Sequence, residues 1–168
     1  KAVWIIGEDI VQTDPNSAHV IDAMNSLELL VVQEIFMSET AKLATVVLPG
    51  TTFLEKNGTF TNTERRIQRV NQAVPPLPGT KTDGMIVTDM MQKLGFDQPT
   101  YDADQVLAEI ADVVPFFKGV TRERLGKMGL QWPVQEDGTD TQILHKETFK
   151  LGKGRLKNFD WKESTEIE

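Results

Sequence analysis

The sequence has no cysteine, only two histidines and no long hydrophobic run. Without cysteine, these 168 residues form no disulfide, no thiolate metal site and no thiol nucleophile. His19 and His145 are far apart in the chain, and neither has a second ligand at metal-binding spacing. No metal site made by this chain alone is therefore expected. No apolar run approaches the roughly 18 residues that a membrane-spanning helix needs, so membrane insertion is not expected either.

Positive charge is also scarce. Lys and Arg number 18 against 25 Asp and Glu, which gives a formal net charge of -7. This balance disfavours nucleic acid and anionic membranes as partners. Hydrophobic residues make up 39% of the chain, enough for a globular core. A cytoplasmic location is expected.

The apolar run at residues 2–6 is too short for a signal peptide. It leads into Gly7-Glu8-Asp9 with no small-residue cleavage site, and so predicts a strand already in progress. The chain also has no initiator methionine. We therefore expect the natural chain to begin earlier.

The first fifty residues alternate strand and helix patterns. Short apolar runs, typical of strands buried on both faces, predict strands at 2–6, 29–32 and 45–48. Helical spacing of apolar residues predicts helices at 19–27 and 38–44. This order favours parallel strands with right-handed crossovers. The predicted fold class is α/β, a parallel-sheet three-layer (Rossmann-like) domain with a helical and irregular C-terminal extension.

The pattern changes after Gly50. Asn57-Gly58 predicts a tight reversal, residues 75–79 an extended connector, and Thr82-Asp83 the start of a helix that ends at Gly95. Helices are also predicted from Tyr101 to Pro115 and over 121–128. The expected domains are an α/β cofactor-gripping domain at 1–95, a helical extension at 96–129, and a linker or hairpin at 130–168 that leads toward an absent C-terminal β-rich domain. Residues 163–168 are expected to fray.

Polar residues follow each of the three predicted parallel strands. They are Gly7-Glu8-Asp9, Gln33-Glu34 and Pro49-Gly50-Thr51. Because the carboxyl ends of parallel strands form one edge, these groups are expected to converge on a ligand site. Gly7 permits close approach of a ligand, and a carboxylate such as that of Asp9, with Thr13 nearby, can accept the two parallel hydrogen bonds that guanine offers. The alternative is that Gly7 ends a strand and Asp14 caps a helix. The usual Gly-x-Gly-x-x-Gly fingerprint is missing.

Two further features have open interpretations. Lys56, Arg65, Arg66 and Arg69 form a basic cluster suited to phosphate or carboxylate, or alternatively a self-paired charged face. Asp83 either contributes to a ligand site or only caps a helix. No Ser–His–Asp arrangement is present, so no catalytic residue is assigned.

Several motifs resemble one family in order along nearly the whole chain. They are residues 7–14 (GEDIVQTD), 31–36 (VVQEIF) with Glu39-Thr40, 46–49 (VVLP), 55–69 (EKNGTFTNTERRIQR), 81–83 (KTD), 130–133 (LQWP), 137–139 (DGT) and 152–156 (GKGRL). They resemble the large, or alpha, subunits of formate dehydrogenases. These are molybdopterin oxidoreductases of the dimethyl sulfoxide reductase superfamily.

The resemblance implies a function. Such subunits hold molybdenum or tungsten between two molybdopterin guanine dinucleotides, oxidise formate to carbon dioxide, and pass electrons through an iron–sulfur cluster. The matching region is an α/β domain that grips one dinucleotide. Asp9, Thr13, Gln33, Gly50 and Asp83 fall at positions that contact this cofactor; Gly7 and Pro49 complete the expected binding set. Gly50 stands where some relatives have Ser, so that Thr51 or the backbone must replace the hydroxyl.

The family's cysteine or selenocysteine metal ligand and its four cluster cysteines have no match here. The resemblance thus implies an internal fragment without activity of its own, with the iron–sulfur cluster in the full-length chain only. Expected partners are the rest of the same polypeptide and electron-transfer subunits. The alternatives are a non-catalytic scaffold domain of a related respiratory-complex subunit, another molybdopterin oxidoreductase, or a freestanding nucleotide-binding protein.

Overall fold

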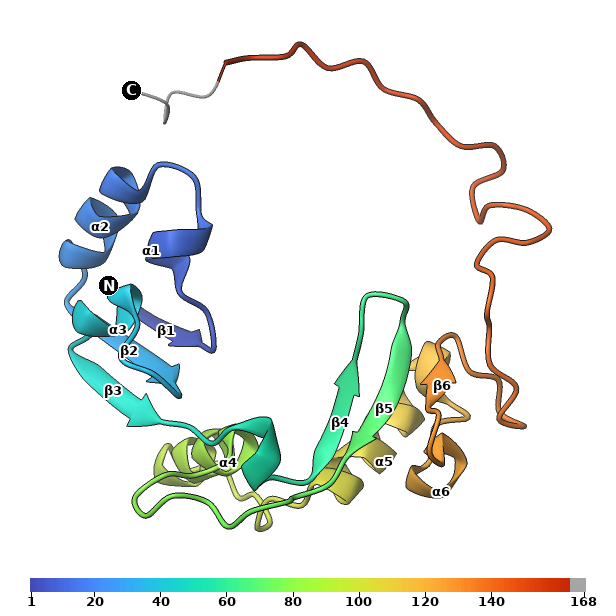
Figure 1. The fold of residues 1–168 in the computed structure, drawn as a ribbon, viewed down its shortest axis with the longest axis horizontal. Coiled ribbons are helices and arrows are strands. Elements are labelled where there is room, and N and C mark those ends of the chain that lie inside the picture. Colours follow the sequence, from blue (N-terminus) through green and yellow to red (C-terminus); the bar gives the residue numbers. More distant parts are fainter. Residues whose placement is uncertain (164–168) are drawn as a thin grey trace. The chain divides into compact units, whose positions relative to one another are not determined.

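The structure is a computed structural model that describes residues 1–163. The residues expected to fray lie, apart from Glu163, outside this range. The elements in chain order are β1 Ala2–Ile6, α1 Ile10–Thr13, α2 Ser17–Asn25, β2 Leu29–Glu34, α3 Glu39–Lys42, β3 Val46–Pro49, β4 Gly58–Thr61, β5 Arg66–Val70, α4 Asp83–Lys93, α5 Ala103–Val113, α6 Arg122–Leu125 and β6 Leu130–Gln131 (Figure 1).

The chain divides into two compact units that differ from the predicted domains. Unit 1 comprises residues 1–56 and 71–101, and unit 2 comprises residues 57–70 together with the described chain from 102 onward. The difference arises because β5, expected in the first domain, pairs with β6 of the C-terminal region.

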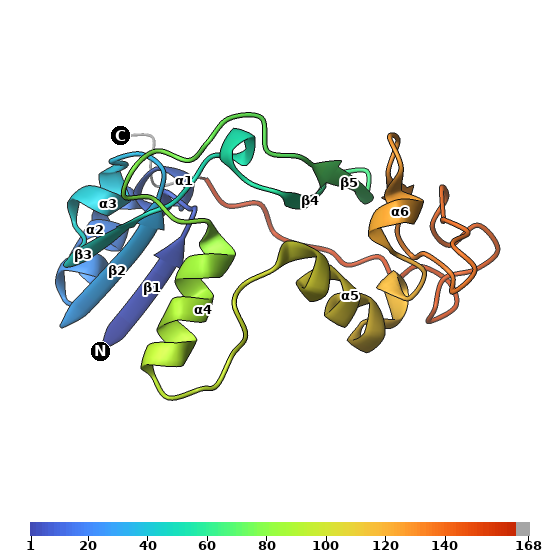
Figure 2. The same cartoon turned by 90° about the horizontal axis from the view of Figure 1, so that it is seen from below.

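Unit 1 contains the predicted parallel sheet, in the order β1-β2-β3. Its core lies on one face, where Ile5, Leu30 and Val32 pack with Ala41 of α3. Met24 and Leu27, at the end of α2 and just after it, pack against the same cluster. Figures 1 and 2 show α4 on the other side of the sheet from α2. The α/β fold class with three layers is confirmed.

Capping side chains explain where α2, α3 and α4 begin. Asn16, Ser38 and Thr82 each accept a hydrogen bond from a backbone N–H of the first turn of α2, α3 and α4. Gly95, with φ of 88°, follows α4 in a left-handed conformation. The short helix α1 lies in the stretch after β1 for which no helix was predicted.

Unit 2 is an antiparallel sheet, β4-β5-β6, with the helices α5 and α6. The buried side chains that form its core are Ile67, Leu107, Val120, Leu125 and Val134. The reversal predicted at Asn57-Gly58 is wrong, because Gly58 already pairs with Val70 inside the ladder. The chain turns instead at residues 62–65.

Asn62 explains the true position of the turn. Its side-chain oxygen accepts from the backbone N–H groups of Glu64 (3.1 Å) and Arg66 (2.9 Å), and Arg65 takes a φ of 69°. These bonds hold the backbone in a reversal that the Asn-Gly dipeptide does not supply. In the described part of 130–163, no second strand pairs with β6, and an isolated bridge joins Phe149 to Gly152. The hairpin expected there is replaced by the pairing of β6 with β5.

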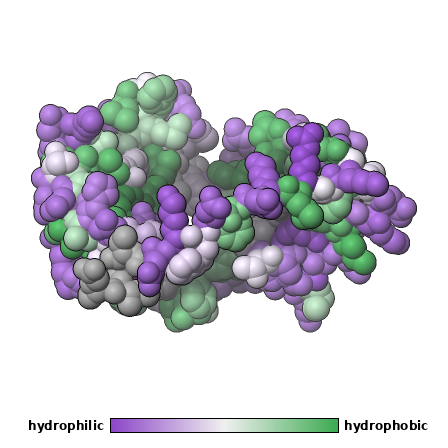
Figure 3. All heavy atoms as spheres, turned by 90° about the horizontal axis from the view of Figure 1, so that it is seen from above, coloured by the Kyte–Doolittle hydropathy of each residue, from purple (hydrophilic) through white to green (hydrophobic). Residues whose placement is uncertain are grey.

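Hydrophobic side chains are exposed in both units. Figure 3 shows green hydrophobic atoms among hydrophilic purple ones on the visible face. In unit 1, Ile6 and Val46 are 47% and 42% exposed at the two edge strands. In unit 2, Leu156, Phe159 and Trp161 of the extended tail are exposed by 77% or more. Within residues 1–163, no helix combines the length and the apolar character needed to cross a bilayer.

Candidate functional site

The ends of the three parallel strands are tied together at one edge of unit 1. Gly7, with φ of 62°, donates its N–H to the carbonyl of Gln33 (2.9 Å). Gly50 donates its N–H to the carbonyl of Glu34 (3.0 Å). Pro49 accepts at its carbonyl from the N–H of Lys81 (3.2 Å). The strand ends therefore converge, as the parallel order requires.

Asp9 lies just before α1 and holds the start of α3. Thr40 donates both its backbone N–H (2.9 Å) and its hydroxyl (2.7 Å) to Asp9 Oδ1. The N–H of Glu39 (3.3 Å) and the side-chain amide of Gln12 (2.6 Å) donate to Oδ2. The pKa of Asp9 is lowered, with the Thr40 hydroxyl as the largest cause. Since a carboxylate has about four acceptor positions, protein donors fill those of Asp9.

Thr13 is exposed at the end of α1. Its hydroxyl donates to Glu8 Oε1 (2.6 Å), so both side chains are engaged locally. Its backbone N–H donates to the carbonyl of Asp9 (3.0 Å). This part of the site is open to solvent, and a ligand there meets a hydroxyl and a carboxylate that are already bonded to each other.

Asp83 is the centre of a second polar group. It lies in the first turn of α4, and its side chain is 42% exposed. Gln33 donates its side-chain amide to Oδ1 (2.9 Å), and Lys56 donates its ammonium to Oδ2 (2.5 Å). Burial raises the pKa of Asp83, but the hydrogen bonds from Lys56 and Gln33 and the charge of Lys56 outweigh it, and the pKa is lowered. Asp83 is thus held as a carboxylate with two acceptor positions still open.

Two buried oxygen atoms of residues at the strand ends have no partner in the described chain. They are Gln33 Oε1 and Thr51 Oγ1, in residues that are 1% and 2% exposed. Buried polar atoms are ordinarily bonded, and an unpartnered one calls for a specific explanation. A ligand that carries hydrogen-bond donors supplies such partners. The donor and acceptor set at this edge therefore fits a polar, nucleotide-like group.

The backbone at Gly50 leaves little room beside Asp83. A β-carbon at Gly50 would lie 3.3 Å from Asp83 Oδ1 and 3.8 Å from the carbonyl of Glu34. Glycine at this position lets the strand end approach the carboxylate closely.

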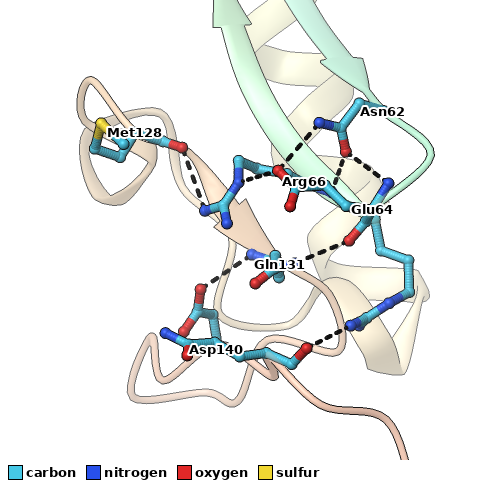
Figure 4. Close-up of polar contacts among 8 residues, drawn as sticks. Asn62, Glu64, Arg66, Met128, Gln131 and Asp140 are labelled. Carbon is cyan, nitrogen blue, oxygen red and sulfur yellow. Dashed lines mark hydrogen bonds and ion pairs between the residues drawn. The ribbon is translucent and has the colours of Figure 1, made fainter.

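The predicted basic cluster is divided. Lys56 belongs to the Asp83 group in unit 1, whereas the three arginines lie in unit 2. Arg66 donates to Glu64 Oε1 (2.7 Å) and to the carbonyl of Met128 (3.5 Å), and Figure 4 shows Asn62 bonded to both residues of this pair. Arg66 thus belongs to a self-paired charged face, the alternative to a phosphate or carboxylate site.

Arg65 binds the backbone of the C-terminal region. Its guanidinium donates to the carbonyls of Trp132, Thr141 (3.0 Å) and Gln142 (3.1 Å). Its carbon Cζ lies 5.9 Å from the centre of the Trp132 ring. Nearby, Gln131 donates its N–H to Asp140 and its side-chain amide to the carbonyl of Glu64 (Figure 4). Arg65 therefore stabilises unit 2.

Two contacts of the site were missed from the sequence. The bond between Gln33 and Asp83 spans 50 positions, and the pair of Lys56 with Asp83 spans 27. Neither separation follows a helix or strand period. The sequence shows the charge of Lys56, but nothing local indicates its partner. Within the described residues, no group of three or more His, Asp or Glu side chains is arranged to hold a metal ion.

The comparisons with known proteins agree with the motifs. Residues 1–93 match the molybdopterin oxidoreductase family. The chain is 42% identical to the F420-dependent formate dehydrogenase subunit alpha of Methanocaldococcus jannaschii, over 99% of this chain and 26% of that protein. It is 45% identical to a putative formate dehydrogenase of Staphylococcus aureus, over 94% of this chain and 16% of that protein. The chain thus spans about a quarter or less of these relatives.

One solved structure supports the fold. Acetylene hydratase from Pelobacter acetylenicus superposes with a TM-score of 0.59 at 18% identity, covering 83% of this chain and 21% of that one. The resemblance to formate dehydrogenase alpha subunits is confirmed at the level of sequence. With its first 93 residues matching the family and its parallel sheet carrying the expected polar edge, the chain belongs to the molybdopterin oxidoreductases, and this membership implies a molybdopterin cofactor.

Proposed function

We propose that this chain binds the guanine dinucleotide part of a molybdenum or tungsten molybdopterin cofactor within a formate dehydrogenase. The whole enzyme then oxidises formate to carbon dioxide. The observation that carries the proposal is the half-exposed Asp83 carboxylate, which has open acceptor positions and lies next to the unpartnered Gln33 Oε1.

Guanine suits this arrangement because of its donors. Its ring N–H and exocyclic amine point the same way, and a carboxylate accepts from both. Asp83 has two positions left, whereas those of Asp9 are filled by the protein. Asp83 is therefore our choice for the base. Asp9 is also part of the proposed binding set. A ligand would bind its Oδ2 by displacing the exposed side-chain amide of Gln12, which now donates to that oxygen.

The other residues of the proposed set act through backbone and hydroxyl groups. Gly7 and Gly50 allow close approach at the strand ends, and Pro49 shapes the edge beside Gly50. Thr13 offers an exposed hydroxyl. The buried hydroxyl of Thr51 replaces the side-chain hydroxyl that Gly50 lacks.

In this proposal the chain binds and orients, and it contributes no catalytic residue. When bound, the metal–pterin centre supplies the two-electron chemistry. Fixed hydrogen-bond partners at the nucleotide end set the position of the pterin end. Their removal is expected to lower cofactor content before it alters intrinsic chemistry.

The test is the cofactor content of the full-length enzyme that contains this segment. We expect Asp83→Asn to lose most of the guanine nucleotide and metal per polypeptide, because an amide nitrogen replaces one of the acceptors. Asp89→Asn, a carboxylate of the same helix that pairs with Lys81 instead of Lys56, is the matched control. Full cofactor content in Asp83→Asn would reject the proposed site. Absence of both metals from the native, anaerobically purified enzyme would favour the scaffold alternative instead.

The proposal includes the context of the segment. The rest of the same polypeptide covers the exposed apolar side chains, electron-transfer subunits bind the whole enzyme, and the iron–sulfur cluster lies in the full-length chain. We place the enzyme in the cytoplasm, which fractionation of the host cells tests. The 168 residues alone are expected to show no formate-dependent dye reduction.

A further inference from the structure

We propose that Lys56 is a positioning residue that orients the Asp83 carboxylate toward the nucleobase. This inference rests on the proposed function, since it concerns how the same site recognises its ligand. Lys56 acts through Asp83 and needs no contact with the base. Its sequence context suggested only a diffuse basic cluster.

The backbone before Lys56 is fixed by a buried carboxylate. Residues 53–55 form one 3₁₀ turn, and Glu55 accepts from the N–H (2.8 Å) and the hydroxyl (2.9 Å) of Thr52. The other oxygen of Glu55 accepts from the N–H of Leu77 (2.9 Å). Glu55 is only 7% exposed. The Cα position of Lys56 is therefore set by the connector at Leu77 as well as by its own turn.

The lysine side chain is itself largely covered, with 21% of its surface exposed. A covered stem has few rotamers, which places the ammonium group at a defined point beside Asp83 Oδ2. Several ion pairs among the described residues lack this confinement. The Lys118–Glu136 pair, for example, is 57% and 78% exposed at 3.4 Å.

The two donors to Asp83 hold different oxygen atoms. Gln33 binds Oδ1 and Lys56 binds Oδ2, so together they fix the plane of the carboxylate. With one donor on each oxygen, each keeps one acceptor position for a ligand. Without Lys56, the carboxylate can turn about its bond to Cβ while keeping its bond to Gln33. The parallel acceptor pair is then no longer presented in one direction.

Lys56 also keeps Asp83 ionised. Among the described residues, three other titratable groups lie on neighbouring segments of the chain. The ring of Tyr101 lies against Gly84, Lys81 on the approach to α4 is paired with Asp89, and Glu34 bonds to the N–H of Ile35. Lys56 is the cation that pairs with Asp83. Its removal raises the pKa of Asp83, and a protonated carboxyl presents a donor where the base needs an acceptor.

The experiment measures cofactor release against pH in the full-length holoenzyme. Bound guanine nucleotide per polypeptide is determined after incubation between pH 4 and pH 8 for wild type, Lys56→Met, Lys56→Arg and Lys118→Met. We expect the midpoint of acid-induced release to move up by about 1 pH unit in Lys56→Met, because an opposite charge lowers a carboxylate pKa by about that much or more. Lys56→Arg restores most of the wild-type midpoint, and Lys118→Met matches wild type.

Each outcome separates the two proposals. If Asp83→Asn loses the nucleotide but Lys56→Met keeps the wild-type profile, the role of Lys56 is rejected and the proposed site stands. If Asp83→Asn retains the nucleotide, the proposed site and the role of Lys56 both fail. The positioning role is also rejected if Lys56→Met loses the same amount of bound guanine nucleotide at all pH values and Lys56→Arg does not restore it. If Lys56→Met does not fold, Lys56→Gln is measured in its place.

Discussion

Gly50 lies close to Asp83, so that a β-carbon on the glycine would be 3.3 Å from the aspartate Oδ1. The strand end and the start of α4 therefore leave room for hydrogen at this position and little more.

Gly50→Ala is expected to lower the guanine nucleotide content of the full-length enzyme severalfold. The added methyl group pushes Asp83 by a few tenths of an ångström, and overpacking of this kind costs about 1–3 kcal/mol. Nucleotide released per polypeptide is the measurement. Gly154→Ala is the control, since its added β-carbon meets nothing closer than 3.9 Å. Equal nucleotide content in both variants would contradict the role of the close approach.

Gln33→Glu is expected to destabilise the apoenzyme increasingly as pH rises. The new carboxylate would lie where the amide now donates to Asp83 at 2.9 Å, in a residue that is 1% exposed. Two adjacent carboxylates cannot easily both ionise, so the folded state raises the pKa of the new glutamate. A raised folded pKa means that the folded form binds more protons, and stability falls as pH passes upward through the titration range.

The measurement is the thermal unfolding midpoint of Gln33→Glu at pH 5 and pH 8, compared with Gln33→Leu. The leucine variant loses the same hydrogen bond without adding a charge. The gap between the two variants should widen from pH 5 to pH 8. A constant gap would show that the two carboxylates are not in contact.

Glu55→Gln is expected to lower stability at pH 7 and to matter less in acid. The pKa of Glu55 is lowered from its ordinary value of 4.5, first by the N–H of Thr52, then by its hydroxyl and by the N–H of Leu77. A lowered folded pKa contributes stability above the unfolded pKa, and this contribution is lost as pH falls through the folded pKa. The measurement is the thermal unfolding midpoint of the full-length apoenzyme. The difference in midpoint between Glu55→Gln and wild type should be smaller at pH 4 than at pH 7. Glu109→Gln, on the exposed face of α5, is the control.

Arg65→Lys is expected to speed hydrogen exchange in residues 130–142 by about tenfold or more. An ammonium group cannot reach the three carbonyls that the guanidinium now binds, and each carbonyl left without its donor costs about 1–3 kcal/mol. Exchange measured by mass spectrometry on peptides of this region is the test. Arg155→Lys, in the exposed tail, should leave the same peptides unchanged. Unchanged exchange in Arg65→Lys would assign the stability of this region to its other contacts.

Most of unit 1 could be predicted because its signals are local. Short apolar runs marked β1, β2 and β3, and Ser38 and Thr82 marked the helix starts where the structure has them. The turn at residues 62–65 could not be predicted in the same way. Asn57-Gly58 has the stronger dipeptide preference, but the side-chain bonds of Asn62 and the pairing of β5 with β6 decide the register.

The sequence predicted which residues lie at the strand ends, but it did not predict which of their side chains contact one another. Polar residues after parallel strands must share an edge, which brought Gly7, Gln33 and Gly50 together. The hydrogen bonds that Thr40 donates to Asp9 and the ion pair of Asp83 with Lys56 depend on how α3 and α4 pack. Such contacts join residues far apart in the chain, and a single sequence carries no period that reports them.

The pairing of β5 with β6 also has a consequence for synthesis on the ribosome. Ile67 leaves the ribosome before its core neighbours, which extend from Leu107 to Val134. The β4–β5 hairpin must therefore remain without its apolar partners while α4 and α5 are still being made. Unit 1, whose three described strands have all been made by Pro49, can assemble sooner. A nascent chain halted before β6 presents Ile67 to solvent, and this hairpin is where we expect a chaperone to bind.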